Sequence, residues 1–177
     1  LSFLATHGPA TPGTIAEQTG IRGMLLEKRL ERLLFLQHIV IAGFTPTDAL
    51  HALGLLRIGN TGMSTRAADL LGSVTGFNAH DFCRHVIERT ETAIEKTILT
   101  YLARSIWIEG NSAHFLNRLD NDLFSVHFAL KLPIIGIGAA ARCFLPNVAA
   151  RLGTTVTFLE HCEVGNAIGA ALIGTME

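Results

Sequence analysis

Apolar and polar positions follow a helical period over residues 1–43. In the segment 24–36, leucines recur three and four residues apart and charged residues fill most of the positions between them. Residues 1–6 and 14–20 carry shorter helical patterns, and Gly20 ends the second. The run His38–Ile41 is expected to form a strand or wing. This order predicts a winged-helix-like unit over residues 1–43.

Helical patterns continue beyond residue 44. Thr45 or Thr47 is expected to cap a helix that holds Pro46 and Asp48 in its first turn, where both residue types are favoured. Three further helices are expected downstream, over residues 64–74 with Ser64 as the cap, 79–108 with Asn78 as the cap, and 113–119.

Strand and helix patterns alternate in the last third of the chain. The apolar run 132–137 enters a Gly-x-Gly turn formed by Gly136 and Gly138. A helix over 142–152, a strand over 154–158 and a small-residue helix over 164–173 follow. A β–α–β–α order is typical of half of an α/β layer. We therefore expect a helix-rich α/β fold with a boundary between residues 1–43 and 44–177.

Composition points to surface that another protein segment covers. Only 16% of residues are charged, against about 25% in a typical domain, and the mean hydropathy is +0.38. The apolar pattern already runs at Leu1, so we expect a piece of a longer protein. The run 132–141 is too short to cross a bilayer, and no transmembrane segment is expected. Three widely spaced cysteines fit a reducing compartment, with the cytoplasm as the default.

Charge gives little attraction to nucleic acid. The net charge is −1, and within the segment 24–36 Lys28, Arg29 and Arg32 are offset by Glu27 and Glu31. A free winged-helix unit most often binds DNA, but we expect here a helical insert that packs on a neighbouring domain, and no nucleic-acid partner. The histidines and cysteines lack the spacing of a zinc site or a local catalytic context. No metal site is predicted, and catalytic residues stay unassigned.

The glycine turn offers backbone atoms to a ligand. Gly136 and Gly138 have no Cβ, and Ala139 and Ala140 have only methyl groups, so a base or ribose could approach the start of the next helix. Tight packing between strand and helix also explains these small residues. The same choice applies to Gly165 and Asn166 in the closing segment, and composition alone does not decide it.

Several blocks together resemble a known family. These blocks are Phe44–Gly54, Ile135–Ala141, Phe144–Pro146, Arg151–Gly153 and Glu163–Ala171. Their order and spacing are similar to the A-subunit family of hydantoinases and 5-oxoprolinases, over about residues 43–173. The resemblance implies a partial ribonuclease-H-like lobe of the actin-like ATPase superfamily. It also implies ATP-dependent hydrolysis or carboxylation of cyclic amides, usually with magnesium.

The resemblance assigns expected roles to particular residues. Gly136, Gly138, Ala139 and Ala140 would form the adenosine-side turn of the second lobe. Gly165 and Asn166 would belong to the helix that packs under this turn. Thr47 and Asp48 match a Thr-Asp element whose role is unsettled, and helix capping alone explains both residues. The implied partners are the remainder of the ATPase lobe and a second hydantoinase-type subunit.

The chain departs from the family in one large respect. The family's first phosphate loop, an aspartate with a glycine-rich turn, is not in this sequence, and residues 1–43 look like an insert. Magnesium on ATP phosphates needs such carboxylates, so we expect no ATP hydrolysis by this chain alone. Two alternatives stay open. One is a winged-helix regulator with a ligand-sensing C-terminal lobe, and the other is a non-catalytic scaffold.

Overall fold

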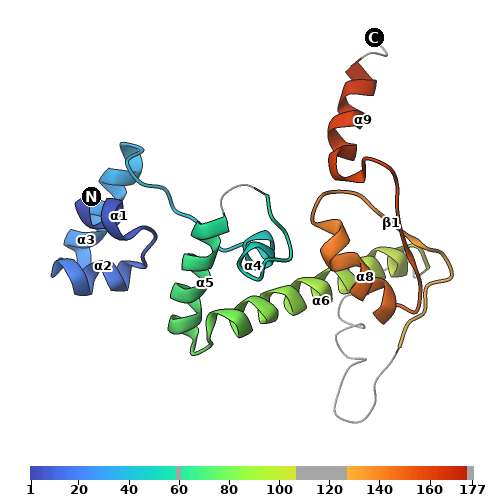
Figure 1. Cartoon of the computed structure of the whole chain (residues 1–177), viewed down its shortest axis with the longest axis horizontal. Helices are drawn as coiled ribbons and strands as arrows, with labels where there is room; N and C mark the ends of the chain where they lie inside the picture. The colour runs from blue at the N-terminus through green and yellow to red at the C-terminus, as the bar shows by residue number, and fades with distance from the viewer. Residues whose placement is uncertain (59–60, 107–126, 175–177) are drawn as a thin grey trace. The chain divides into compact units, whose positions relative to one another are not determined.

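The chain folds into a helix-rich structure with a small parallel sheet (Figure 1). A computed structural model describes residues 1–58, 61–106 and 127–174. It is 66% helical and mostly α with minor β, which confirms the helix-rich part of the prediction. The expected helix over 113–119 lies outside the described residues. Among those described, no helix is both long enough and apolar enough to span a membrane.

The chain divides into two compact units, residues 1–84 and 85–177. The division falls inside a single long helix. It lies at a different position from the expected boundary after residue 43, which stays a prediction. Each unit is described below by itself.

The first unit is built from helices. In chain order they are α1 (Ser2–His7), α2 (Pro12–Thr19), α3 (Gly23–Phe35), α4 (Pro46–Ala52), α5 (Thr61–Thr75) and the start of α6 (Ala79–Ile106). Ile15 and Leu26 are the buried residues of α2 and α3. Ala49, Leu50 and Ala68 are buried on α4 and α5, which pack against each other.

Capping residues set several of these helix ends. The Thr11 side chain accepts a hydrogen bond from the Thr14 amide at the start of α2. The Asn78 Oδ1 atom accepts one from the Asp81 amide at 2.8 Å, which confirms Asn78 as the cap of α6. Each cap satisfies a backbone donor that the first helical turn leaves free.

Two predictions in this unit were wrong. No strand forms over residues 38–41, because α3 ends in a tight turn with Gln37 at a positive φ of 56° and no described segment pairs with the chain that follows. The wing of a winged helix is therefore missing from the described residues. Ser64 does not cap α5, which already begins at Thr61. It is buried and donates its hydroxyl to Asp48 instead.

The second unit contains the sheet. β1 (Ile134–Gly136) pairs in parallel with β2 (Val156–Phe158), in a register that places Gly136 opposite Phe158. The helix α8 (Ala141–Arg151) connects them and packs on both strands. A single 3₁₀ turn, η1 (Cys162–Val164), and α9 (Gly165–Gly174) follow. The core of this unit consists of Phe144, Val148, Ala149, Leu152 and Cys162.

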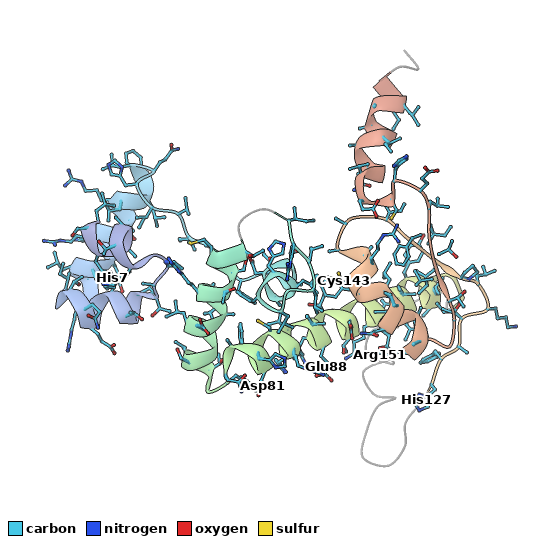
Figure 2. All side chains as sticks on the ribbon, viewed as in Figure 1. His7, Asp81, Glu88, His127, Cys143 and Arg151 are labelled. Carbon is cyan, nitrogen blue, oxygen red and sulfur yellow. The ribbon has the colours of Figure 1, made fainter. Side chains whose placement is uncertain are left out.

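A buried ion pair holds α8 on α6 within this unit. The Glu91 side chain is 4% exposed and accepts hydrogen bonds from Arg151 at 2.9 Å and Asn147 at 2.7 Å. Arg151 lies at the last turn of α8 (Figure 2). It also reaches Thr92 and Glu95 on α6. A buried carboxylate needs partners of this kind, so the contact fixes the C-terminal end of α8.

Arg151→Met should destabilise the chain more than Glu91→Gln. The first substitution strands a buried carboxylate and should cost about 3 kcal/mol, whereas the second leaves a neutral amide that still accepts from Asn147 and should cost about 1 kcal/mol. Urea unfolding followed by circular dichroism measures both. Equal costs for the two variants would contradict the assignment of Glu91 as a charge that needs Arg151.

Candidate functional site

The Gly-x-Gly turn lies between β1 and α8. Gly138 has a φ of +106°, which residues with a side chain rarely adopt, and a Cβ placed on it would meet no atom within 4 Å. Its amide donates to the Cys162 carbonyl oxygen at 2.7 Å. The turn is therefore tied to η1, and the Cα of Gly138 faces open space.

Gly136 has a packing role. It is buried, and a Cβ at this position would overlap the Phe158 ring and approach Leu145 Cδ1 to 3.0 Å. The missing side chain is what lets β2 and α8 close on β1. Packing thus accounts for Gly136, while the open side of the turn lies at Gly138.

Ala139 and Ala140 lie at the start of α8. Both are half-buried, and Ala140 is the residue that precedes the helix, with no side-chain cap. The amides of Ala141 and Cys143 bond to carbonyls inside the turn. The positive end of the helix dipole lies at this point, and neither Ala139 nor Ala140 has a side chain larger than a methyl group.

Gly165 lies beside the same turn. It is the first residue of α9, and a Cβ on it would lie 3.1 Å from Ile137 Cγ2. Asn166, the next residue, is exposed. The structure thus brings the two glycine blocks together at the carboxyl end of β1, although about thirty residues separate them in the sequence.

Arg142 is a candidate site residue that sequence reasoning missed. Its Nε donates to Glu163 Oε1 at 2.8 Å, and its guanidinium lies 4.8 Å from the centroid of the Phe158 ring. The backbone amide of Glu163, together with Arg142, holds the pKa of the Glu163 carboxyl below its usual range. A cation in the first turn of a helix is unfavourable because it opposes the helix dipole. This unusual position could have singled out Arg142 in the sequence.

Thr47 and Asp48 belong to the first unit, on α4. The Asp48 carboxylate accepts from the Thr45 amide and hydroxyl at one oxygen and from the Ser64 hydroxyl, at 2.6 Å, at the other. Thr45 in turn accepts from the Asp48 amide, which completes a capping box. Thr47 is half-buried beside it. The capping interpretation explains Asp48 fully, and its carboxylate has few free positions for a ligand.

One buried polar atom on α4 lacks a partner. His51 Nε2 is buried without a hydrogen bond to any described residue. Buried polar atoms are normally satisfied, so His51 Nε2 is an exception among the described polar atoms of this unit.

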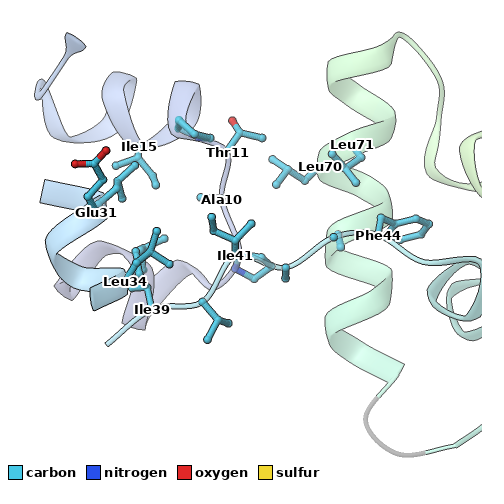
Figure 3. Close-up of a pocket in the computed structure, with 18 of the residues that line it drawn as sticks. Ala10, Thr11, Ile15, Glu31, Leu34, Ile39, Ile41, Phe44, Leu70 and Leu71 are labelled. Carbon is cyan, nitrogen blue, oxygen red and sulfur yellow. The ribbon is translucent and has the colours of Figure 1, made fainter. Parts of the chain in front are cut away.

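The first unit also contains an apolar cavity of about 530 Å³ (Figure 3). Its wall comes from α1–α3, the extended segment 39–44 and α5, with Ile15, Leu34, Ile41 and Leu70 among the lining residues. The acidic side chains on this wall are Glu27 and Glu31. The cavity brings together no nucleophile and base, and no group of metal ligands is found among the described residues. It offers space without catalytic chemistry.

No protein-family model, no curated protein and no solved structure matches the chain.

Gly136→Ala and Gly169→Ala should change stability in opposite directions. The methyl at position 136 overlaps Phe158 and should cost about 1–3 kcal/mol. The methyl at position 169 of α9 meets nothing within 4 Å, and alanine favours a helix by about 0.5–1 kcal/mol. Denaturant unfolding of both variants checks the signs. Adding Phe158→Leu should recover part of the loss at 136, and a neutral Gly136→Ala would refute the packing assignment.

Asp48 should give the chain acid sensitivity. Partial burial raises the pKa of Asp48, but hydrogen bonds from Ser64 and Thr45 outweigh it and hold the pKa below the ordinary value, which is about 3.9. A lowered folded-state pKa contributes stability that is present above the unfolded value and lost as the pH falls through the folded one. Urea unfolding between about pH 6 and pH 2 should therefore show a loss below about pH 4 that is smaller in Asp48→Asn. An identical acid profile in both proteins would contradict this account.

Proposed function

We propose that this chain forms the adenosine side of a split ATP site in a hydantoinase/oxoprolinase-like ATPase. The sequence blocks that resemble this family motivate the proposal. The observation that carries it is the juxtaposition of Gly138, the start of α8 and Gly165 at one end of β1.

Backbone geometry supports a nucleotide at this turn. Ligands of α/β proteins bind at the carboxyl ends of parallel strands, and β1 ends at Gly136, immediately before the turn. The α8 helix supplies a positive dipole end there, and Gly138 leaves its outer side open. An adenosine ribose or base could contact these atoms without displacing a side chain.

Arg142 supplies a second contact surface for the base. About half of its side chain is exposed (49%), while Glu163 and Phe158 hold the guanidinium in place. A planar guanidinium stacks well on aromatic rings, and purines have such a face. Because the residue is already oriented, little rotamer entropy is lost when a base stacks on it.

The phosphate side of the site is not supplied by the described residues. No group of carboxylates that could hold magnesium is present among them, and a magnesium ion bridging ATP phosphates requires oxygen ligands of that kind. In the proposal, ATP and magnesium bind to the longer parent protein, whose other lobe supplies these groups. The chain by itself binds the adenosine moiety weakly and does not hydrolyse ATP.

Adenosine should shift the amide resonances of Gly138, Ala139, Ala140 and Gly165 in an NMR titration of the chain. We expect a dissociation constant on the order of 1 mM, because only one wall of the site is present. Arg142→Ala should weaken binding about fivefold, the equivalent of about 1 kcal/mol of stacking. Arg89→Ala, on the exposed part of α6 in the same unit, is the matched control and should leave the affinity unchanged.

Inorganic pyrophosphate separates base recognition from anion binding at a helix terminus. Pyrophosphate should not shift the amide resonances of these four residues if the site recognises the adenosine moiety. Absence of shifts at about 10 mM adenosine, or equal shifts with pyrophosphate, would reject the adenosine-side assignment and favour the scaffold alternative. ATP calorimetry of a longer parent protein, with magnesium, then tests the complete site.

A further inference from the structure

The connection between α2 and α3 has the length and the glycine typical of a helix-turn-helix. α2 ends at Thr19, Gly20 adopts a left-handed φ of 70°, and α3 begins at Gly23 after a three-residue connection. Helix-turn-helix units join their helices by three or four residues, often including glycine, and place the second helix in the major groove of DNA. The position of α3 in this unit corresponds to the recognition helix.

The two sides of α3 differ in chemistry. Leu26 is buried, and Leu30 and Leu33 are half-buried on the same side. At 100° per residue, Lys28, Arg32 and Arg29 occupy an arc of about 100° on the other side, and Glu27 and Glu31 lie outside it. All three cations are exposed, and no ion pair holds them among the described residues. The exposed face of α3 is therefore locally basic although the whole chain is not.

Exposed apolar residues precede the cations in α3, with Leu25 inside the arc of the cations and Met24 about 40° outside it. Met24 and Leu25, in the first turn of α3, are 69% and 56% exposed. Residues near the N-terminus of a recognition helix contact base edges, and apolar side chains there pack on the thymine methyl group. Arg22, which precedes the helix, is also exposed.

We propose that α3 binds duplex DNA, with Lys28, Arg29 and Arg32 on phosphates and Met24 and Leu25 toward the base edges. This inference is independent of the proposed nucleotide site, which lies in the other unit. It also revises the expectation that nucleic acid is not a partner, because Glu27 and Glu31, which offset the three cations in the sequence, lie outside the arc that the cations occupy on α3.

Two other occupants fit the face less well. A protein interface is depleted of charge, and of lysine in particular, at its centre, whereas the centre of this face carries Lys28 and Arg32. A second copy of the chain, packed α3 against α3, would bring these same cations together. The phosphates of DNA are anionic, so they pair with the cations at the centre of the face and no like charges are brought together. Residues 1–43 hold four cations and three acidic groups, so binding should be modest and strongly salt-dependent.

Fluorescence anisotropy of the full 177-residue chain with a random duplex of roughly 20 base pairs tests the proposal. Three phosphate contacts predict a slope of log affinity against log salt of about −2.7. Lys28→Ala with Arg32→Ala should reduce this slope to about −0.9 and weaken binding at least about tenfold at roughly 50 mM salt. Both positions are exposed on a helix, where alanine is well tolerated.

Matched variants test whether DNA binding depends on the exposed face of α3 or only on the total positive charge of the chain. Arg57→Ala with Arg66→Ala removes the same net charge from exposed positions outside the helix-turn-helix and should leave binding within about twofold. Glu31→Gln, beside the basic arc, should strengthen binding. Absence of DNA binding at roughly 50 mM salt, or equal losses in the two double variants, would overturn the proposal. Salt-sensitive dimerisation by sedimentation without DNA binding would assign the face to a second copy instead.

Discussion

The close approach of β2 and α8 to Gly136 is the constraint on which the second unit depends. Phe158 and Leu145 occupy the volume that any side chain at this position would need. Their packing sets the distance between the two strands and the helix that joins them. The turn at Gly138 and its hydrogen bond to Cys162 follow from this closure, because the chain must reverse direction within a few residues of a filled core.

The opposite end of α8 is held by charge. Arg151 and Asn147 donate hydrogen bonds to the buried Glu91 carboxylate. A carboxylate exposed to water would not need such partners. The helix is thus fixed by apolar packing at one terminus and by a buried ion pair at the other. Both ends of α8 are therefore held, and Glu163 and Phe158 position Arg142 in its first turn. The proposed function relies on such a preorganised helix start.

Each unit has a helix with large apolar side chains exposed on its surface. The face of α3 and the whole of α9 expose large apolar side chains, and α9 has no buried residue among those described. Exposed groups of this size commonly mark interaction surfaces. The composition already indicated such a surplus, and the structure assigns it to particular helices. On α3 the exposed apolar side chains are mixed with cations, whereas on α9 the remaining residues are glycine, alanine and Asn166.

Local patterns were sufficient for much of the fold and for part of the candidate site. Helical spacing located α3 and α6, and the cap Asn78 placed the start of α6. The strand expected over 38–41 failed because β propensity without a partner strand does not make a sheet. Ser64 was misassigned because a hydroxyl that caps a helix and one that bonds a distant carboxylate look alike in sequence.

The sequence by itself determined most of the described helices, the caps at Thr45 and Asn78 and the small residues of the Gly136–Ala140 turn. These features depend on backbone conformation and on neighbours within about four residues. Tertiary structure decided which role each small residue has. Phe158 fills the space at Gly136, and Arg142 lies over the same ring, through contacts between residues 16 to 22 positions apart. Contacts at that separation arise only when strands and helices pack, so no local pattern encodes them.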